Sequence, residues 1–295
     1  MATDVRAFPR SGGYHLLMPE LPEVQTIVSQ LAPRLGGAVV KSVSLRPGKL
    51  FRTSHRVLRT RLPGHRVVRV TRQGKRIIME LTPPAYLIVH LGMTGRLLFR
   101  SPEEQLDKHT HLRLGFTGRP WEVRFVDPRR FGGVWFIPDA KDEKRGSLRA
   151  LGPDALTIRL PVLREIVGRR RQIKALLLDQ QAISGLGNIY SDEALFAARI
   201  HPATRASELD ERQVRALASA IRKTLRDSIA QGGTTMSDYR DTNGSEGAFW
   251  NRLRVYGREG EPCPRCGSGI RRIILAGRST HFCPSCQRCR RTPKN

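Results

Sequence analysis

The sequence is short of acidic residues and has no hydrophobic run long enough to cross a membrane. Asp and Glu number 26 against 52 Lys and Arg, which gives a formal net charge of +26. A surface this basic repels itself unless a polyanion neutralises it. No run of about 18 apolar residues and no basic amphipathic anchor is present, which argues against an anionic membrane as that polyanion. Nucleic acid is therefore the expected partner.

A secretion signal and a scattered set of cysteines are also missing. Residues 1–17 contain one acid and two arginines, without the apolar core of roughly 7 to 15 residues that a secretory signal needs. The five cysteines are confined to residues 263–289 and do not form a framework spread along the chain. These absences predict a reducing compartment.

The patterning changes from strand-like to helix-like near residue 140. With 295 residues, 39% of them hydrophobic, the chain can hold two domains and a small third. Residues 141–149 are charged, contain glycine and predict a linker. Short β-rich runs before it predict a sandwich or flattened barrel. These runs are residues 67–70, 76–81, 86–91, 96–99, 111–116, 121–126 and 133–137.

Apolar residues at helical spacing predict helices on both sides of these strands. One helix begins near Pro22 and packs against the sheet. Others are expected at residues 173–178, 190–198 and 214–229, the last ended by Gly232-Gly233. The join Ser184-Gly185-Leu186-Gly187-Asn188 would suit a plain turn between helices. On a chain this basic, its glycines and the N–H groups of the following helix favour phosphate binding.

The stretch Met18-Pro19-Glu20-Leu21-Pro22-Glu23-Val24 predicts that translation starts at Met18 and that the working protein begins with Pro19. A terminal proline is a secondary amine and can attack an electrophilic carbon, whereas an internal proline is an amide. The product is an iminium, which keeps its positive charge beside the carbon attacked. A helix start would explain Pro22, but it leaves Pro19 and Glu20 without a role.

Two C-x-x-C pairs near the carboxyl terminus predict one structural Zn²⁺ ion. Cys263, Cys266, Cys283 and Cys286 have the spacing of a four-thiolate site. Redox chemistry is the alternative for a single pair, but two pairs in a segment too short for its own core favour a structural metal. The interval predicts a β-hairpin with Arg278 near its tip. Cys289 is left over.

Six motifs in order along residues 18–286 resemble bacterial formamidopyrimidine-DNA glycosylase. They are more specific together than any one of them alone. Besides the cysteines, they are Pro19-Glu20-Leu21-Pro22-Glu23 with Lys75, His90-Leu91-Gly92-Met93-Thr94-Gly95, Asp127-Pro128-Arg129-Arg130-Phe131-Gly132, Gly187-Asn188-Ile189-Tyr190 and Gly232-Gly233-Thr234-Thr235.

The resemblance implies an α+β, multi-domain fold. Residues 1–18 would be a leader or extension absent from the active protein. The remainder would comprise an N-terminal β-sandwich catalytic domain with a flanking helix (19–148), a helix-two-turn-helix DNA-binding domain (149–252) and a zinc finger with a basic tail (253–295).

The resemblance also implies a function in base-excision repair. The enzyme would be both a DNA glycosylase and an apurinic or apyrimidinic lyase. It would remove 8-oxoguanine and formamidopyrimidines from double-stranded DNA and then nick the strand by β,δ-elimination. It is expected to be a monomer of the bacterial cytoplasm, associated with the nucleoid and not with a membrane.

Three residues have catalytic roles by resemblance. Pro19 would attack C1′ of the damaged nucleoside, Glu20 would act as acid and base near the sugar ring oxygen, and Lys75 would hold the phosphate beside the lesion. Glu23 would support the amine. Without the motif, Lys75 would be read as a solvated turn residue, and an acid at a helix start would be explained by the helix dipole.

Seven further residues are expected to contact DNA. An enzyme that acts on a base within a duplex must flip the nucleotide out and fill the gap. Met93 and Phe131 would be apolar wedges, and Arg129 would donate to the unpaired partner base, although Met and Phe are more often core residues. Phosphate contacts or their support would come from Lys174, Asn188, Tyr190 and Arg278.

Two alternatives remain open from the sequence. If the leader is kept, Pro19 is an amide and the chain would be a non-catalytic zinc-finger DNA-binding protein. A glycosylase of the endonuclease VIII type, acting on oxidised pyrimidines, is the other; Leu21 and the segment from Arg129 to Phe131 favour the purine-specific branch by resemblance. Ser237 stands where some relatives carry lysine, so the lesion preference is open.

Overall fold

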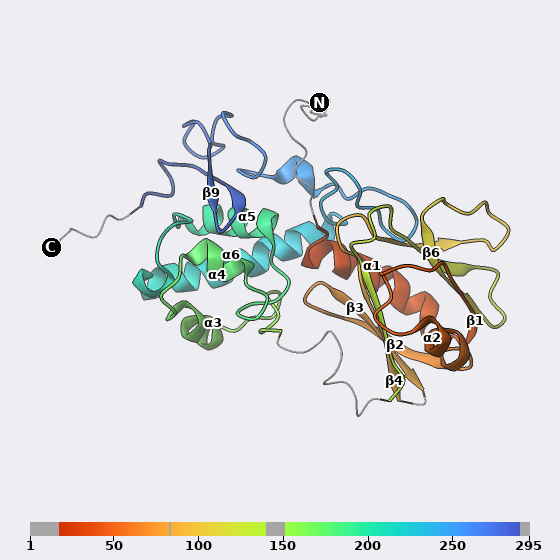
Figure 1. The fold of residues 1–295 in the computed structure, drawn as a ribbon. Coiled ribbons are helices and arrows are strands. Elements are labelled where there is room, and N and C mark those ends of the chain that lie inside the picture. Colours follow the sequence, from red (N-terminus) through yellow and green to blue (C-terminus); the bar gives the residue numbers. More distant parts are fainter. Residues whose placement is uncertain (1–17, 83, 140–150, 290–295) are drawn as a thin grey trace.

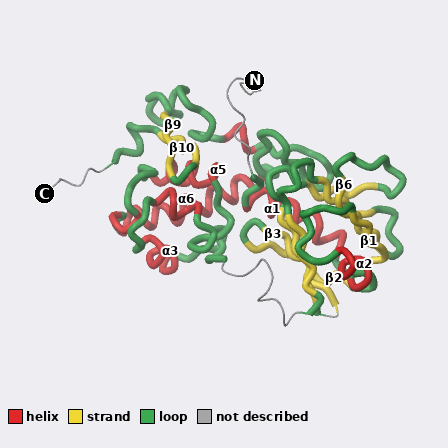
Figure 2. Tube along the Cα trace, viewed as in Figure 1, coloured by secondary structure: helices red, strands yellow, loops and turns green. Residues whose placement is uncertain are grey.

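The computed structural model describes residues 18–82, 84–139 and 151–289. The chain forms two units side by side, a strand-rich one from its first half and a helix-rich one from its second half (Figures 1 and 2). The expected leader up to residue 17, the expected linker at 141–149 and the last residues of the basic tail lie outside the described residues.

The first unit is a β-sandwich of two four-stranded antiparallel sheets, as predicted. The strand orders are β2-β3-β4-β8 and β1-β6-β7-β5. The strands are β1 (Val40–Leu45), β2 (Arg66–Gln73), β3 (Arg76–Thr82), β4 (Ala85–His90), β5 (Arg96–Arg100), β6 (Thr110–Phe116), β7 (Glu122–Val126) and β8 (Gly133–Ile137).

Strand β1 is absent from the runs that the sequence indicates. Its pairing with β6 shifts between Val40 and Ser42, and its exposure pattern does not alternate. A register shift of this kind adds a residue on one strand and removes the period of two on which strand prediction depends. The short helix α2 (His55–Arg61) was likewise not predicted; Ser54 caps it, and Leu58 is its one fully buried residue.

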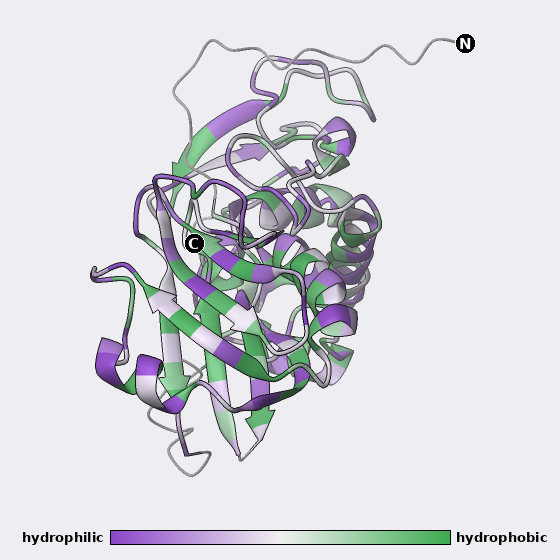
Figure 3. Cartoon of the chain, turned by 90° about the vertical axis from the view of Figure 1, so that its right-hand side faces the viewer, coloured by the Kyte–Doolittle hydropathy of each residue, from purple (hydrophilic) through white to green (hydrophobic). Residues whose placement is uncertain are grey.

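Side chains from both sheets form one shared core. Ile77, Leu87 and Val134 come from one sheet, and Leu112 and Val123 come from the other; each is at most 1% exposed. Figure 3 views the molecule from the side of the β-sandwich and shows hydrophobic and hydrophilic residues alternating along the strands. Alternation of this kind is the reason that a sandwich buries one face of each sheet.

Helix α1 (Leu21–Leu35) packs against the sandwich and also reaches the second unit. Pro22 lies in its first turn, and Glu20 is its N-cap, with Glu23 completing a capping box. Its stripe of Val24, Ile27, Val28, Leu31 and Leu35 is buried in the core of the sandwich. Because α1 contacts both β2 and the long helix of the second unit, the residues at its amino end lie between the two units.

The second unit is helical and carries a β-hairpin at its end. Its elements are α3 (Leu160–Val167), α4 (Ile173–Leu178), α5 (Asn188–Ala198), η2 (Ala206–Glu208), α6 (Glu211–Ala230), η3 (Phe249–Arg252), β9 (Arg271–Leu275) and β10 (Arg278–Phe282). The helices share a second hydrophobic core, and β10 packs against α5. In the part of the chain described, no helix is long and apolar enough to cross a membrane.

Candidate active site

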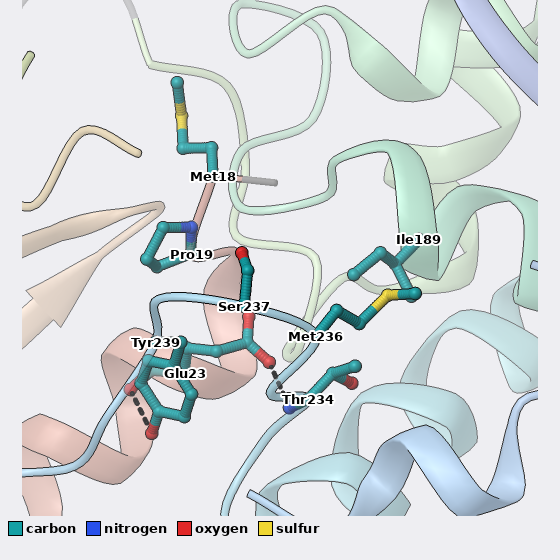
Figure 4. Close-up of a pocket in the computed structure, with 8 residues that line it drawn as sticks. All are labelled: Met18, Pro19, Glu23, Ile189, Thr234, Met236, Ser237 and Tyr239. Atoms are coloured by element: carbon teal, nitrogen blue, oxygen red, sulfur yellow. Dashed lines mark hydrogen bonds between the residues drawn. The ribbon is translucent and has the colours of Figure 1, made fainter. Parts of the chain in front are cut away.

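Pro19 lies at a pocket between the two units. The pocket is shallow: the space between its lining atoms is about 260 Å³ when the open solvent at its mouth is included, and only about 10 Å³ of it can hold the centre of a water molecule. Pro19 itself is buried, whereas Met18 before it is 39% exposed. The lining residues come from α1 and the segment before it, from α5 and from the loop after α6; they are Met18, Pro19, Glu23, Ile189, Thr234, Met236, Ser237 and Tyr239 (Figure 4).

The Glu20 carboxylate binds the amino end of α5. It accepts hydrogen bonds from the backbone N–H groups of Gly187 (2.6 Å) and Ile189 (2.9 Å). The glycines and helix start of this segment predict phosphate binding; in the structure the Glu20 carboxylate takes two of the N–H groups, as the positive end of a helix dipole favours. Burial raises the pKa of Glu20, and the nearby charge of Lys75 opposes that rise.

Gly187 is required where these groups meet. A Cβ atom at this position would lie 2.4 Å from Cδ of Glu20 and 2.7 Å from Nζ of Lys75. Both separations are far inside van der Waals contact, so any side chain here would push the two charged groups away. Two of the motifs noted in the sequence, that of Glu20 with Lys75 and that of Gly187, therefore meet within a few ångströms although they lie far apart along the chain.

Lys75 is half-buried at the turn between β2 and β3. Burial lowers its pKa, while the charges of Glu20 and Glu23 act in the opposite direction. The turn is held by Arg72, which binds the Asp154 carboxylate of the second unit. The cation expected at the lesion phosphate thus lies beside the expected acid, in a fixed turn.

Glu23 accepts hydrogen bonds from three different segments. Oε2 accepts from the N–H of Glu20 (2.7 Å), and Oε1 accepts from the N–H of Thr234 (2.8 Å) and from the hydroxyl of Tyr190. The Tyr190 hydroxyl also lies 2.7 Å from Oγ of Ser228. Burial raises the pKa of Glu23 to about 7. The carboxylate links α1 with α5 and with the loop after α6.

Two expected DNA contacts are buried in the structure. The Tyr190 side chain is fully buried and serves Glu23, so it has no surface to offer a phosphate. The Lys174 side chain is also fully buried; its Nζ lies 2.7 Å from Oδ1 of Asp192 and 3.0 Å from the carbonyl oxygen of Asn188. The expectation that Lys174 binds a phosphate directly is wrong for this structure, because its charge is already paired.

Asn188 and Arg278 lie where the second unit meets the hairpin. Asn188 Nδ2 donates to the carbonyl oxygen of Ser279 over 2.8 Å. Arg278 is exposed at the start of β10, next to the tip. Asp192 Oδ2 accepts from the N–H of His281 at 2.9 Å, so the Lys174 ion pair also anchors the hairpin. Arg278 is therefore available to a ligand, and Asn188 positions the strand that carries it.

The expected wedge residues come from two interlocked loops. The Arg129 guanidinium lies 4.6 Å from the centre of the Phe131 ring, and that ring is 53% exposed. Met93 is half-buried in the neighbouring loop. A Cβ on Gly92 would lie 2.4 Å from the backbone of Phe131, so the glycine allows the loops to touch. An exposed phenylalanine stacked by arginine fits insertion between bases.

The positioning roles of Asp127 and Glu193 were not predicted from the sequence. Asp127 accepts from Thr94 Oγ1 (2.5 Å) and from the N–H of Gly132 (2.8 Å), which joins the two wedge loops. Glu193 is fully buried, and its Oε1 accepts from three consecutive N–H groups, those of residues 254–256. The available signal was the pair of adjacent acids, Asp192 and Glu193, in the largely buried helix α5, because buried acids need dedicated partners.

The four predicted cysteine ligands come together. Their Sγ atoms all lie within 4.8 Å of one another, and the pair formed by Cys266 and Cys283 is 3.5 Å apart. Four thiolates about 2.3 Å from a zinc ion at the corners of a tetrahedron are about 3.8 Å apart, so the cluster fits one structural zinc. Cys289 is exposed and does not belong to the cluster.

Family comparisons cover both units and the hairpin. Residues 18–134 match the formamidopyrimidine-DNA glycosylase N-terminal domain, residues 151–240 the H2TH domain of the same family, and residues 260–291 a zinc finger found in this family and in IleRS. The formamidopyrimidine-DNA glycosylase of Desulforamulus reducens is 39% identical over 278 residues, covering 92% of this chain and all of the relative. That of Acaryochloris marina is 41% identical over 282 residues, covering 92% and 99%.

Solved structures show the same similarity. The MutM (Fpg) protein of Thermus thermophilus superposes with a TM-score of 0.80 at 39% identity, covering 91% of this chain and 98% of that one. The Lactococcus lactis Fpg protein, in a complex with DNA that contains N7-benzyl-Fapy-dG, superposes with a TM-score of 0.84 at 34% identity, covering 92% and 100%.

Proposed function

The chain belongs to the formamidopyrimidine-DNA glycosylase family, and from this we propose that Pro19 carries its chemistry as a free amino-terminal amine. Members of this family are base-excision repair DNA glycosylases with apurinic or apyrimidinic lyase activity. The observation that carries the proposal is the position of Pro19, at a pocket lined by both units and within one residue of the anchored Glu20.

In the proposed reaction the Pro19 nitrogen forms a bond to C1′ as the bond from C1′ to the damaged base breaks. The base leaves with the bonding electron pair and takes up a proton. The Pro19 nitrogen then loses its proton, the ring oxygen takes up a proton and leaves C1′ as a hydroxyl, and the product is an iminium that withdraws electrons from the sugar. Loss of a C2′ proton then expels the 3′ phosphate, and a second elimination expels the 5′ phosphate.

Glu20 is suited to transfer the protons of these steps. It is buried, its pKa is raised, and two amides fix its orientation, which is the preparation that general acid and base catalysis requires. Lys75, beside it, would hold the phosphate adjacent to the lesion. Glu23 would hold the backbone of Glu20 and, through Thr234, the start of the loop that lines the base pocket.

The proposed substrate is duplex DNA that contains 8-oxoguanine or formamidopyrimidines. Met93, Arg129 and Phe131 would enter the duplex where the damaged nucleotide leaves it, and the pocket lined by Met236 and Ser237 would receive the base. Asn188 and Arg278 would contact the backbone. The zinc finger would fix Arg278 against α5.

We also propose how the chain is divided into domains and where the protein works. We divide the protein into a catalytic domain (19–148), a helix-two-turn-helix domain (149–252) and a zinc finger with a basic tail (253–295), preceded by a leader or extension (1–18). We propose a monomer that works on nucleoid DNA in the cytoplasm, without attachment to a membrane.

Borohydride trapping tests the central proposal. Borohydride reduces the iminium to a stable amine, so a duplex with one 8-oxoguanine should become covalently attached to the protein, and peptide mass analysis should place the adduct on Pro19. Two forms of the protein are compared, one that begins at Pro19 and one that keeps residues 1–18. The intact mass of each preparation establishes its first residue.

Adduct from the short form alone is the expected result. Equal trapping by a preparation whose mass shows the leader fully retained would refute Pro19 as the nucleophile. Salt-sensitive DNA binding without any adduct from either form would indicate a DNA-binding protein without this chemistry.

A further inference from the structure

One end of the β-sandwich has a surface rich in exposed cations. From Val24 to Met79 the sequence contains no Asp or Glu, although Lys and Arg recur throughout. Eight exposed cations of this stretch lie on β1, on α2, on the segment between them and at the first residue of β2. We name them the α2 surface; they are Lys41, Arg46, Lys49, Arg52, Arg56, Arg59, Arg61 and Arg66.

These cations have no ion pair with any acid in the described part of the chain. Arg46, Arg59 and Arg66 donate to backbone carbonyls, which holds their side chains against the surface. The side chains of the other five make no hydrogen bond within the described residues. By contrast Arg69, just beyond this surface, is paired with Glu80 at 2.8 Å. The α2 surface is therefore a field of uncompensated positive charge.

This surface is separate from the proposed catalytic site. Figure 1 shows α2 and β1 at the end of the first unit that is far from α5, whereas the turn between β2 and β3, which carries Lys75, is joined to the second unit by the ion pair of Arg72 with Asp154. A duplex held by Glu20, Lys75 and the wedge loops would occupy the region between the units. The charge on α2 is not used by that contact.

The composition of the surface favours a nucleic acid backbone over a membrane. Six of its eight cations are arginines, whose planar guanidinium matches two phosphate oxygens at once. Firm membrane attachment combines charge with apolar side chains that insert into the bilayer. Val68 is the one large hydrophobic side chain among the exposed described residues of the segment 36–79, and the apolar residue Leu58 of α2 faces the core.

We propose that the α2 surface binds the phosphate backbone of a second segment of double-stranded DNA while the site between the units holds a first. This rests on the proposed function only in placing the first duplex between the units. A contact of this kind is independent of sequence and is driven by the release of counterions. It would let the enzyme pass from one DNA segment to another without leaving DNA.

The test measures binding of a second duplex to a loaded protein. The protein is saturated with an unlabelled duplex of about 15 base pairs, roughly 50 Å long, that carries an abasic-site analogue. A labelled undamaged duplex of equal length is then titrated at several salt concentrations. The test variant, K49Q/R52Q/R56Q/R61Q, removes four cations whose side chains make no hydrogen bond or ion pair within the described residues.

We expect the variant to bind the second duplex at least 10-fold more weakly at about 0.1 M salt, with the slope of log K against log salt reduced by up to about 3.6. Binding of the first duplex and borohydride trapping should not change. The matched control, R159Q/R169Q/R212Q/R226Q, removes the same charge from exposed positions on the second unit and should retain the second-duplex slope of the unaltered protein.

Three results would overturn the proposal. They are equal weakening by both variants, no weakening by the test variant, and loss of binding to phosphatidylserine vesicles by the test variant with second-duplex binding intact. Trapping is measured separately, so failure of the Pro19 proposal would appear as missing adduct while second-duplex binding could still be scored.

Discussion

Arg72 and Asp154 form a two-point ion pair that joins the two units. Nη1 of Arg72 lies 2.6 Å from Oδ2 of Asp154, and Nη2 lies 3.0 Å from Oδ1. The same carboxylate accepts from the N–H of Gly74 at 3.3 Å, and Lys75 is the next residue. The pair therefore sets the position of the turn that brings Lys75 to Glu20.

We expect D154A to destabilise the protein and to slow trapping. The Arg72 side chain is 6% exposed, and loss of its partner leaves a nearly buried cation, at a cost of about 1.5 to 3 kcal/mol in the free energy of unfolding. Urea denaturation measures this cost. In the control, E211A breaks the ion pair with Arg164, whose side chains are 43% and 48% exposed, and should cost less than about 1 kcal/mol. Equal costs for the two variants would contradict this account.

E20Q should fold, bind DNA and lose its chemistry. A glutamine oxygen can keep one of the two amide hydrogen bonds at α5, but the side chain no longer donates or accepts a proton in the reaction. The rate of adduct formation should fall by about 10²- to 10⁴-fold. E246Q, which changes an exposed acid beyond the pocket, is the control and should trap at the normal rate. Normal trapping by E20Q would remove Glu20 from the mechanism.

Glu23 should make stability depend on pH. Its pKa rises from 4.5 to about 7 on folding because of burial, so between these values the folded protein holds a proton that the unfolded chain has lost. The free energy of unfolding should therefore fall as pH rises from 4.5 to 7 and level off above it, by an amount of the order of 3 kcal/mol. Thermal unfolding of E23Q, compared with the unaltered protein across pH 5 to 8, should lack this part of the slope. Parallel curves would disprove the assignment.

K174M should destabilise the protein by about 3 to 5 kcal/mol, because it leaves the buried Asp192 carboxylate without its cation. K174M/D192N should recover part of this loss, since asparagine is neutral and still accepts from the N–H of His281. If Lys174 instead contacted a DNA phosphate, K174M would change the salt dependence of DNA binding. Loss of such a contact lowers the salt slope of DNA binding by about 1, whereas a buried pair leaves the slope unchanged in the folded protein.

Removal of zinc should release the hairpin that carries Arg278. Chelation, or C283S, should lower the affinity for DNA and expose the hairpin to proteolysis, because a segment of this size depends on its metal for folding. C289S is the matched control, as Cys289 lies outside the cluster, and it should retain one bound zinc by metal analysis. Loss of zinc by C289S would mean that the ligand set is wrong.

The sequence predicted those features that depend on local spacing. The four cysteines, the stripe on α1 and the alternation in most strands each follow from a period or an interval that the chain displays directly. Strand β1 was not predicted because a register shift removed its period of two. Helix α2 was not predicted because a single fully buried residue makes no periodic pattern.

Residues whose role depends on a partner far along the chain could not be placed. Lys174 looked like a free cation because Asp192, its partner, sits 18 positions away on another helix. The N–H groups at Gly187 and Ile189 looked open to phosphate because nothing in their own segment takes them. The carboxylate that accepts from them belongs to Glu20, which lies 167 positions before Gly187 in the sequence. Charge pairing across such separations is decided by tertiary packing.

The anchoring of Glu20 by the amides of α5 has a consequence for how this enzyme can be divided. A fragment containing only the sandwich would hold the proposed nucleophile, the acid and Lys75, yet the acid would swing free. A fragment containing only the helices would leave the N–H groups of Gly187 and Ile189 without the Glu20 carboxylate. We therefore expect neither unit alone to catalyse the reaction, because the reactive centre is complete only where the two units meet.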